Sequence, residues 1–544
     1  DGEQGGGGGG GGGGGRGTVA DLGVGKPGAP VDNEYASDLR RRAAELHTEI
    51  ARFAERENAR NKQRSLWQTA QILNSELSAL KERQLTLGGQ RGPVARDRAA
   101  DRRRAAADAD AVTPSELRAL ERGRPANTKC ANARHPEFRI AMALPWMASP
   151  GTSTAKLPPW LPFFIATAGH SSLLIDWFIF HESTLSAQQL PHGLRVSNVK
   201  LVDLHSGGMA TLFARTMGAA IGLPETNVSA ISSRMRYMFQ KWPRLVAEYK
   251  PAYGSIFGEW FVNYSHWGYS DMDVVLGQAA RFIERSELHD FQIVTYSFGD
   301  SEAVYLRGQW TVHQNAKRVN TIWLQCKHLA EGLQHELFQK VAWARRMEAL
   351  GKQSYHKRFL SAEGCYSHRA AHTENVRIKV ANKQFVGLTV AKPATDDVYV
   401  IGGALWLCRK EKREPNLDNL RHASSPFCDV ELKGVQRPLG KPEPFEVTAE
   451  GCGNWMPAEF RMCAPHLKGS LRHNLLLSGG RFFAQEYEEA NTIVAENGRC
   501  KQGAFFHMQE WKKRWDETGA NIDQRAEFDT FKLSQDGIHA LPKI

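Results

Sequence analysis

The chain has 544 residues, a net charge of +11 and eight cysteines. No run of eighteen apolar residues exists, so we predict no transmembrane helix, and the absence of a Cys-x-x-Cys pair argues against a structural zinc site. The positive charge raises nucleic acid as a partner, but no zinc-finger spacing or Arg-Gly repeat accompanies it. We therefore do not expect nucleic-acid binding; a polyanionic acceptor or an acidic membrane surface would explain the same charge.

Three segments of distinct composition precede the predicted globular part. Residues 1–34 are rich in glycine, so we expect a disordered tail. Residues 35–87 are predicted to form a helical or coiled-coil stalk that could self-associate, and residues 88–135 a basic linker. The stalk prediction rests on apolar residues at alternating steps of four and three, as at Leu39, Ala43, Leu46, Ile50 and Phe53. Because the sequence begins with Asp, we also expect an upstream segment, such as a membrane anchor.

From Pro136 onward, short apolar runs alternate with predicted helices. The predicted strands are Phe138–Leu144, Ile175–Phe180, Asn198–Asp203 and Phe291–Tyr296, and the predicted helices cover residues 163–172 and 207–221. This alternation indicates an α/β fold with a mostly parallel sheet flanked by helices. We expect residues 136–385 to form the core of the domain and residues 386–544 to complete it. Ligands of such sheets bind at the carboxyl ends of the strands.

Two carboxylates one residue apart, Asp271 and Asp273, lie between an aromatic turn and a predicted buried strand. Carboxylate oxygens are the ligands that Mg²⁺ and Mn²⁺ prefer, and such an ion can neutralise a departing diphosphate. A second Asp-x-Asp triplet, Asp108 to Asp110, lies in a polar Ala/Arg-rich tract that cannot build a pocket. Context therefore favours Asp271 and Asp273 as the metal ligands.

A series of segments in the globular part resembles a family of poorly characterised GT-A-type glycosyltransferase-like proteins, in order and spacing as well as in motif. The segments are Trp160–Phe164, Ile175–Phe180, Asn198–Lys200, Lys250–Phe257 and Trp267–Asp273, followed by Leu306–Asn315 and the late Phe505–Lys512. The resemblance implies a Rossmann-related domain that binds a nucleotide sugar, with UDP as one candidate nucleotide, through a metal ion.

The resemblance also implies roles for side chains around the acidic pair. Many GT-A enzymes complete the metal shell with a late His, for which His507 is the candidate, and an imidazole suits Mn²⁺. Lys250 stands where the family has a Lys-Pro-Ala motif, so its ammonium could contact the donor diphosphate. Trp267 and Tyr269 could stack on a nucleobase or sugar, although both are equally compatible with a place in the core.

A catalytic base is harder to assign from the sequence. If the enzyme inverts the anomeric centre, a carboxylate must deprotonate an acceptor hydroxyl. Asp300 and Glu302 follow a predicted strand, and Glu363 lies where the family usually shows an acidic motif. None of these three is favoured over the others by the sequence.

The remaining signals concern the cellular compartment. Four cysteines between residues 428 and 500 lie in a Gly/Pro-interrupted region that disulfides could staple, and two glycosylation sequons begin at Asn227 and Asn263. These features favour the Golgi or another secretory-pathway lumen, and a cytoplasmic location stays open. The sequence thus predicts a metal-dependent glycosyltransferase acting on a glycan or protein acceptor. The alternative is a catalytically inactive GT-A-like protein that binds carbohydrate or serves as a scaffold.

Overall fold

The computed structural model describes residues 137–542 with several gaps, the longest being 148–157, 183–193, 352–361, 384–395 and 425–435. These residues belong to one compact unit, Arg124–Ile544. The predicted tail (1–34), stalk (35–87) and linker (88–135) lie outside the described residues.

Four parallel strands form the first block of the central sheet: β1 (Ile140–Pro145), β2 (Ile175–His181), β3 (Val199–Asp203) and β4 (His266–Ser270). Their order in the sheet is β3-β2-β1-β4, and every pairing within the block is parallel. β2 and β4 are buried along their whole length, as expected of parallel strands that are covered on both faces. The three strands predicted first in the chain are confirmed as β1, β2 and β3.

The rest of this sheet is mixed. β6 (Ile293–Ser297) runs parallel to β8 (Arg377–Asn382), whereas β7 (Trp310–Gln314) runs antiparallel between β4 and β6. Antiparallel strands from late in the sequence extend the sheet beyond β8: β13 (His473–Ser478), β14 (Arg481–Glu489), β11 (Gln436–Pro438) and β12 (Glu443–Phe445). The parallel pairing expected for most of the sheet is thus concentrated in the block β3-β2-β1-β4.

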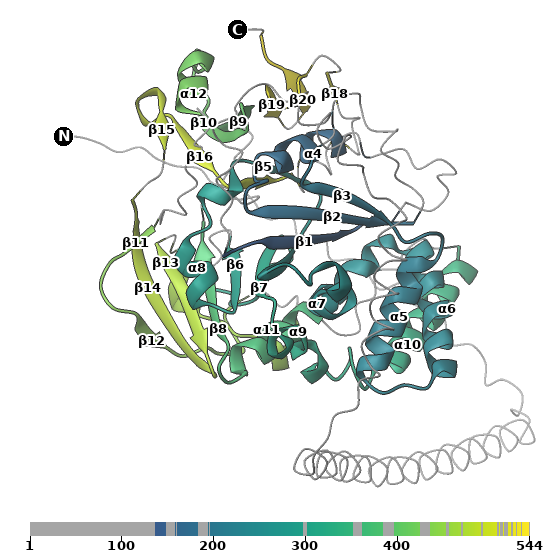
Figure 1. The fold of residues 1–544 in the computed structure, drawn as a ribbon. Coiled ribbons are helices and arrows are strands. Elements are labelled where there is room, and N and C mark those ends of the chain that lie inside the picture. The colour runs from purple at the N-terminus through teal and green to yellow at the C-terminus, as the bar shows by residue number, and fades with distance from the viewer. Residues whose placement is uncertain are drawn as a thin grey trace, which may run out of the picture. The chain divides into compact units, whose positions relative to one another are not determined.

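Helices cover both faces of the sheet. Alternate side chains of β1 point to opposite faces, so Ala141 and Ala143 join one core cluster while Ile140, Met142 and Leu144 join another. The first cluster is closed by α5 (Gly208–Ala220), α6 (Glu225–Lys241), α7 (Tyr253–Ile256), α10 (Leu333–Ala349) and α11 (Ala362–His372). The second is closed by α4 (Leu161–Gly169) and α8 (Arg285–Asp290). Figure 1 shows α5, α6 and α10 packed side by side. The two predicted helices are confirmed as α4 and α5, with shifted ends.

Shorter helices connect these elements. They are α9 (Lys317–Asn320), α12 (Leu417–Ala423) and the 3₁₀ segments η1 (Pro243–Ala252), η2 (Gly258–Trp260), η3 (Ala279–Arg281), η4 (Ile322–Gln325), η5 (Ala458–Phe460), η6 (Pro465–Leu467) and η7 (Glu496–Gly498). None of the helices in the described part of the chain has both the length and the apolar character that crossing a membrane requires.

A second sheet and a two-stranded ribbon are built mainly from the C-terminal part. The sheet has the order β15-β16-β10-β9-β19-β20-β18 and lies near the top of Figure 1. Its strands are β9 (Asp396–Ile401), β10 (Ala404–Arg409), β15 (Val494–Ala495), β16 (Cys500–Gly503), β18 (Asn521–Ile522), β19 (Thr530–Ser534) and β20 (Gly537–Ala540). The ribbon pairs β5 (Val274–Leu276) with β17 (Phe505–His507).

Three disulfides join described cysteines: Cys326–Cys365, Cys408–Cys500 and Cys452–Cys463. Within the region expected to be stapled, Cys452 pairs with Cys463, whereas Cys500 pairs with a cysteine outside it. Cys130 and Cys428 lie outside the described residues. Cys326–Cys365 fixes α11 to the segment that follows η4, which matters below because α11 carries Glu363.

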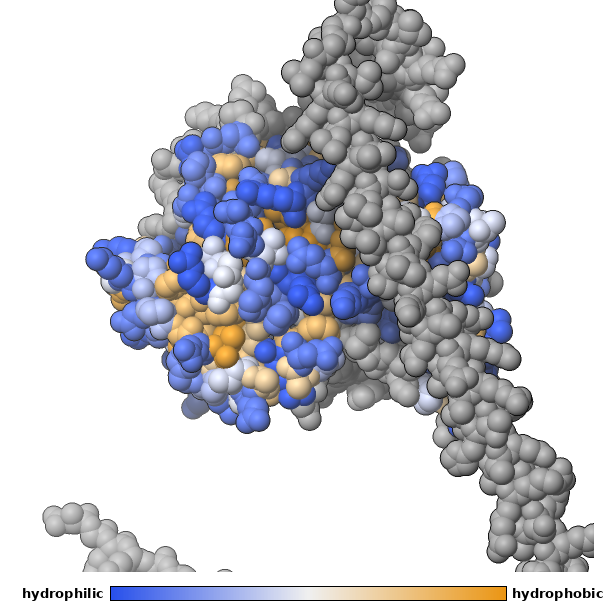
Figure 2. Space-filling view, turned by 90° about the horizontal axis from the view of Figure 1, so that it is seen from below, coloured by the Kyte–Doolittle hydropathy of each residue, from blue (hydrophilic) through white to orange (hydrophobic). Residues whose placement is uncertain are grey.

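The surface seen in Figure 2 is mainly hydrophilic, with hydrophobic residues gathered between the polar ones. The large hydrophobic side chains that are most exposed come from well-separated parts of the sequence: Val262, Phe338, Leu350, Leu439 and Val494. Scattered exposure of this kind is ordinary for a folded protein and indicates no particular partner.

Candidate metal centre

Asp271 and Asp273 lie in the short loop between β4 and β5. Asp271 is the first residue after the carboxyl end of β4. β1 and β4 are adjacent parallel strands, and the chain leaves β1 toward β2 on the other side, so the strand order reverses between β1 and β4. Ligands of open α/β sheets bind outside the carboxyl ends of the strands at such a reversal. The fold therefore places the acidic pair where a ligand site is expected.

His507 reaches this loop through the ribbon of β5 and β17. In this ribbon His507 is paired with Val274, the residue that follows Asp273. The next residue, Met508, donates its N–H to the Asp273 carbonyl over 2.9 Å. The two strands approach closely at Gly277, whose N–H donates to the Ala504 carbonyl over 2.8 Å. A Cβ atom on Gly277 would lie 2.3 Å from the carbonyl oxygen of Gly503, closer than atoms can pack. Glycine at this position thus permits the pairing that brings His507 to the acidic loop.

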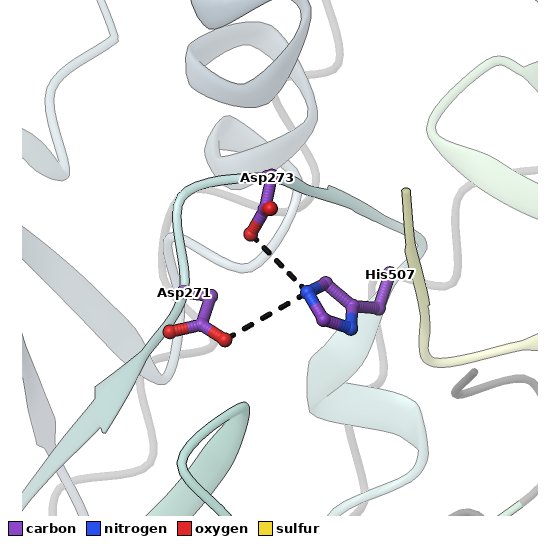
Figure 3. Close-up of side chains that lie close together, drawn as sticks. All are labelled: Asp271, Asp273 and His507. Carbon is purple, nitrogen blue, oxygen red and sulfur yellow. Dashed lines mark ion pairs between the residues drawn. The ribbon is translucent and has the colours of Figure 1, made fainter. Parts of the chain in front are cut away.

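The three side chains converge on one point (Figure 3). His507 Nε2 lies 3.2 Å from Asp273 Oδ1 and 3.7 Å from Asp271 Oδ2. One ligand atom from each residue lies within 4.8 Å of the other two. The His507 side chain is 3% exposed and that of Asp271 29%, so the cluster is closed on the imidazole side and more open at Asp271.

The donor set fits a divalent cation. Carboxylate oxygens and an imidazole nitrogen are ligands that Mn²⁺ accepts, and Mg²⁺ accepts the oxygens readily. Two ligands at right angles around an octahedral ion, each about 2.1 Å from it, lie about 3 Å apart. The separation of 3.2 Å between His507 Nε2 and Asp273 Oδ1 is close to that spacing. Asp271 is somewhat farther away and would have to move slightly to join the same ion.

Lys250 contacts the acidic loop at the oxygen of Asp271 that is not the one nearest His507. Its Nζ donates to Asp271 Oδ1 over 2.6 Å and to the Gly308 carbonyl over 2.7 Å. The Lys250 side chain is 12% exposed. The nearby Glu248 does not share this site, because its Oε2 accepts a hydrogen bond of 2.6 Å from Lys340 on α10. Lys250 is therefore the residue of this segment whose charge is placed against the acidic pair.

Glu363 is linked to the same place through Gly308. The Gly308 N–H donates to Glu363 Oε1 over 3.0 Å, while the Gly308 carbonyl accepts from Lys250. A Cβ atom on Gly308 would lie 3.4 Å from Lys250 Nζ and 3.5 Å from Glu363 Oε1, so the two side chains border the same backbone atom. The role of Gly308 could not be predicted from the sequence, because Gly308 contacts both side chains through its backbone atoms.

The structure links neither of the other two candidate bases to the site by a described contact. Asp300 lies outside the described residues. The Glu302 carbonyl accepts from the Ala464 N–H over 2.9 Å, and among the described contacts none joins the Glu302 carboxylate to the acidic pair. Of the two candidates that the structure describes, Glu363 is the one whose carboxylate is connected to Lys250, through Gly308.

Trp267 and Tyr269 lie in the core instead of lining an open site. The Trp267 ring stacks on His313 at a centroid distance of 4.0 Å, and Phe261 lies parallel to its other side at 6.3 Å. Trp267 is fully buried and Tyr269 is 2% exposed, so neither offers a free face to a nucleobase or sugar. Of the two roles that the sequence left open for these rings, their burial favours core packing.

Burial keeps the groups beneath the site uncharged. It raises the pKa of Tyr269, and the carboxylates of Glu363 and Asp271 raise it further, although a hydrogen bond with Thr311 opposes them. Burial also lowers the pKa of His313 to about 3, with a smaller contribution from His266. Tyr269 and His313 are thus both neutral near pH 7.

Comparison with known proteins adds one match. A family of unknown function, DUF6625, matches residues 225–399. The matched segment contains Lys250, Asp271, Asp273 and Glu363, and it ends before His507. No curated protein matches the chain.

Proposed function

We propose that this protein is a metal-dependent glycosyltransferase of the GT-A type, which moves a sugar from a nucleotide-sugar donor to a hydroxyl of a glycan or protein acceptor. The observation that carries the proposal is the convergence of Asp271, Asp273 and His507 within 4.8 Å at the carboxyl edge of the sheet. The strand order β3-β2-β1-β4 also matches the first four strands in the order 3-2-1-4-5-6 of a dinucleotide-binding sheet.

Mn²⁺ or Mg²⁺ would be held by Asp271, Asp273 and His507. When bound, the ion supplies positive charge against the diphosphate of the donor, for which a UDP-sugar is our first candidate. Lys250 supplies a second positive charge next to Asp271, over 2.6 Å, and so stabilises the negative charge that develops on the leaving diphosphate. Both groups act on the leaving group, so little other chemistry is required of the protein.

Glu363 is our candidate for the base that deprotonates the acceptor hydroxyl. Its Oε1 is oriented by the Gly308 N–H over 3.0 Å, and the Cys326–Cys365 disulfide fixes the first turns of α11 on which it lies. A carboxylate held beside the site can accept a proton from an acceptor bound against the donor sugar. This assignment applies to a reaction that inverts the anomeric centre.

The three disulfides support a secretory-pathway lumen, such as the Golgi, as the place of action. Disulfides persist in oxidising compartments and are rare in the cytosol. Cys408–Cys500 and Cys452–Cys463 lie in the C-terminal part that also carries His507.

The proposal is tested by measuring nucleotide release from a panel of nucleotide sugars with Mn²⁺, for the unmodified protein and for Asp273→Asn. We expect a donor that turns over only with the metal, and at least about a hundredfold loss in Asp273→Asn. Asp290→Asn is the matched control, because the Asp290 side chain is 47% exposed and lies on α8 away from the loop. Turnover that survives both Asp273→Asn and a chelator would refute the metal-dependent mechanism. Metal-independent glycan binding without turnover would favour the inactive alternative.

A further inference from the structure

A polar cavity lies at the end of the central strands opposite to the acidic loop. It has a volume of about 620 Å³, within the range of ligand pockets. Three arginines line it together with neutral polar residues, and we call it the arginine cavity. Its defining residues are Arg318, Arg377, Arg481, Gln292, Asn375 and Ser478.

The sheet register brings these residues together. β6 and β8 are parallel, with Ile293 opposite Ile378, so Gln292 and Arg377 meet at the amino ends of these strands. The Arg377 N–H donates to Gln292 Oε1 over 2.8 Å, and the Gln292 N–H donates to the Arg377 carbonyl over 2.9 Å. β13 ends at Ser478 opposite Arg377, and the hairpin turn returns the chain at Arg481. The backbone at the floor of the cavity is therefore held by sheet pairing.

The hairpin turn at the rim of the cavity requires glycine at both of its central positions. Gly479 and Gly480 have φ values of +54° and +76°, the left-handed pair of a tight two-residue hairpin. This turn places Arg481 directly opposite Ser478. Arg318 lies on α9, which follows β7. The end of β7 lies beside the amino end of β6, where the Gln314 N–H donates to the Gln292 carbonyl over 2.7 Å.

The arginine cavity is separate from the metal centre. Trp267 of β4 and Ile293 of β6 both pair with His313, so the amino ends of β4 and β6 lie at one level. Asp271 follows the opposite end of β4, which at about 3.3 Å per residue places it roughly 16 Å farther along the strand direction. A ligand in the cavity thus does not share contacts with the acidic loop.

The three arginines outnumber the acid in the cavity lining, so its net charge is positive. Among the described residues, no carboxylate forms an ion pair with Arg318, Arg377 or Arg481, and the lining contains a single acid, Glu374. Guanidinium groups bind sulfate, phosphate and carboxylate through paired hydrogen bonds. The side-chain amides of Gln292 and Asn375 and the Ser478 hydroxyl can both donate to and accept from sugar hydroxyls.

We propose that the arginine cavity binds an acidic oligosaccharide, one that carries sulfate, phosphate ester or carboxylate groups. The three arginines bind the anionic groups, and the amides, the hydroxyl and Glu374 contact sugar hydroxyls. That the ligand is an anion follows from the three arginines of the cavity, whereas the choice of a glycan rests on the proposed function. The site would hold an acidic acceptor chain at a distance from the metal centre.

The test is direct binding of a labelled, heparin-derived sulfated hexasaccharide to the full chain, in a chelator and at near-physiological salt. The cavity variant carries Arg377→Gln and Arg481→Gln. The matched control carries Arg215→Gln and Arg346→Gln, which remove the same charge from exposed positions of α5 and α10. We expect the cavity variant to weaken binding at least about tenfold and the control less than about twofold. Thermal unfolding of each variant verifies that it is folded.

Several outcomes would overturn the proposal. Equal weakening in both double variants would show a diffuse charge effect, and equally tight binding of a neutral hexasaccharide would show that the arginines do not select the ligand. Tighter binding of a phosphorylated peptide of the same charge would contradict a glycan ligand. Binding that needs Mn²⁺ and is lost in Asp273→Asn would place the ligand at the metal centre. Conversely, metal-independent binding in a protein without transferase activity would support the cavity and contradict only the proposed function.

Discussion

Asp271 contacts a different nitrogen through each of its carboxylate oxygens. Oδ1 lies 2.6 Å from Lys250 Nζ, and Oδ2 lies 3.7 Å from His507 Nε2. A cation bound on the side of His507 can therefore leave the ion pair with Lys250 in place. Under the proposed function, the bound cation and the Lys250 ammonium would each lie next to a different oxygen of the Asp271 carboxylate.

This arrangement predicts opposite effects when Lys250 is replaced by Met. Because like charges repel at short range, removing the ammonium should keep or strengthen Mn²⁺ binding, by up to about tenfold. Affinity for a nucleotide diphosphate in the presence of Mn²⁺ should fall by about tenfold, because one of its cationic partners is lost. Calorimetric titration with Mn²⁺ and with the nucleotide diphosphate measures both affinities. The control is Lys200→Met, because Lys200 lies against Phe178 on β2. A parallel loss of Mn²⁺ and nucleotide affinity would contradict the assigned role.

The sequence singled out Asp271 and Asp273 by context, because they adjoin a predicted buried strand, whereas Asp108 and Asp110 lie in a polar tract. It could not decide between a stacking and a core role for Trp267, since a large aromatic ring on a strand suits both. The Lys250–Gly308–Glu363 connection was also beyond reach, because two of its hydrogen bonds use backbone atoms of Gly308. Side-chain chemistry leaves a signal in the sequence, and backbone contacts of this kind do not.

At the scale of elements, the candidate metal centre depends on a ribbon between segments that are distant in sequence. β5 follows Asp273 directly, and β17 ends at His507. β17 also follows β16 of the second sheet, so this sheet determines where the imidazole is presented. A change that separates β17 from β5 should therefore affect metal binding without altering any proposed ligand.

Gly277→Ala is such a change. The added Cβ would meet the Gly503 carbonyl oxygen at 2.3 Å, so the ribbon must shift. We expect a loss of about 1 to 3 kcal/mol in the free energy of unfolding, and at least about tenfold weaker Mn²⁺ binding through displacement of His507. Gly258→Ala is the control, because a Cβ there meets no atom within 4 Å. Mn²⁺ binding that is unchanged in a destabilised Gly277→Ala protein would show that the ribbon does not position the site.

β1 and β2 were predictable because parallel strands buried on both faces are mainly apolar runs, as in Ile175–His181. The late strands were not, because their partners are far away in sequence and their burial is uneven. β14 alternates irregularly between buried and exposed positions, and it joins the sheet only through β13 and β8. The neighbourhood of His507 and Asp273 was expected from the family resemblance, and no local pattern indicated the pairing of β17 with β5.

Across the whole molecule, buried ionisable groups set how stability depends on pH. Burial lowers the pKa of His266 to about 4 and that of His313 to about 3. A buried cluster of charged side chains, Glu287 on α8 with Lys379 and Lys383 at β8, also affects the pH dependence. There burial alone would raise the pKa of Glu287, but Lys379 and Lys383 lower it to about 2, so this carboxylate stays ionised above pH 4.5.

These shifts predict that the protein loses stability between pH 7 and pH 4.5. In this range the unfolded chain binds protons at His266 and His313, with an ordinary pKa near 6.5, and the folded protein does not. The free energy of unfolding should therefore decrease as the pH is lowered from 7 to 4.5, by about 2 to 3 kcal/mol for each of the two histidines. The contribution of Glu287 is retained here, since it is lost only at lower pH. Urea unfolding at a series of pH values measures the slope.

His313→Gln should reduce this slope by the share of one histidine, whereas His335→Gln, at an exposed position of α10, should leave it unchanged. A free energy of unfolding that is equal at pH 7 and pH 4.5 would contradict the assignment of buried, neutral histidines.

The most direct test of the account is the stoichiometry of Mn²⁺ binding, measured by electron paramagnetic resonance or calorimetry on the full chain. We predict one saturable ion per chain, with affinity reduced at least about tenfold in each of Asp271→Asn, Asp273→Asn and His507→Ala, and unchanged in Asp290→Asn. An absence of saturable binding, or an affinity that all three substitutions leave unchanged, would contradict the claim that these side chains form a metal centre.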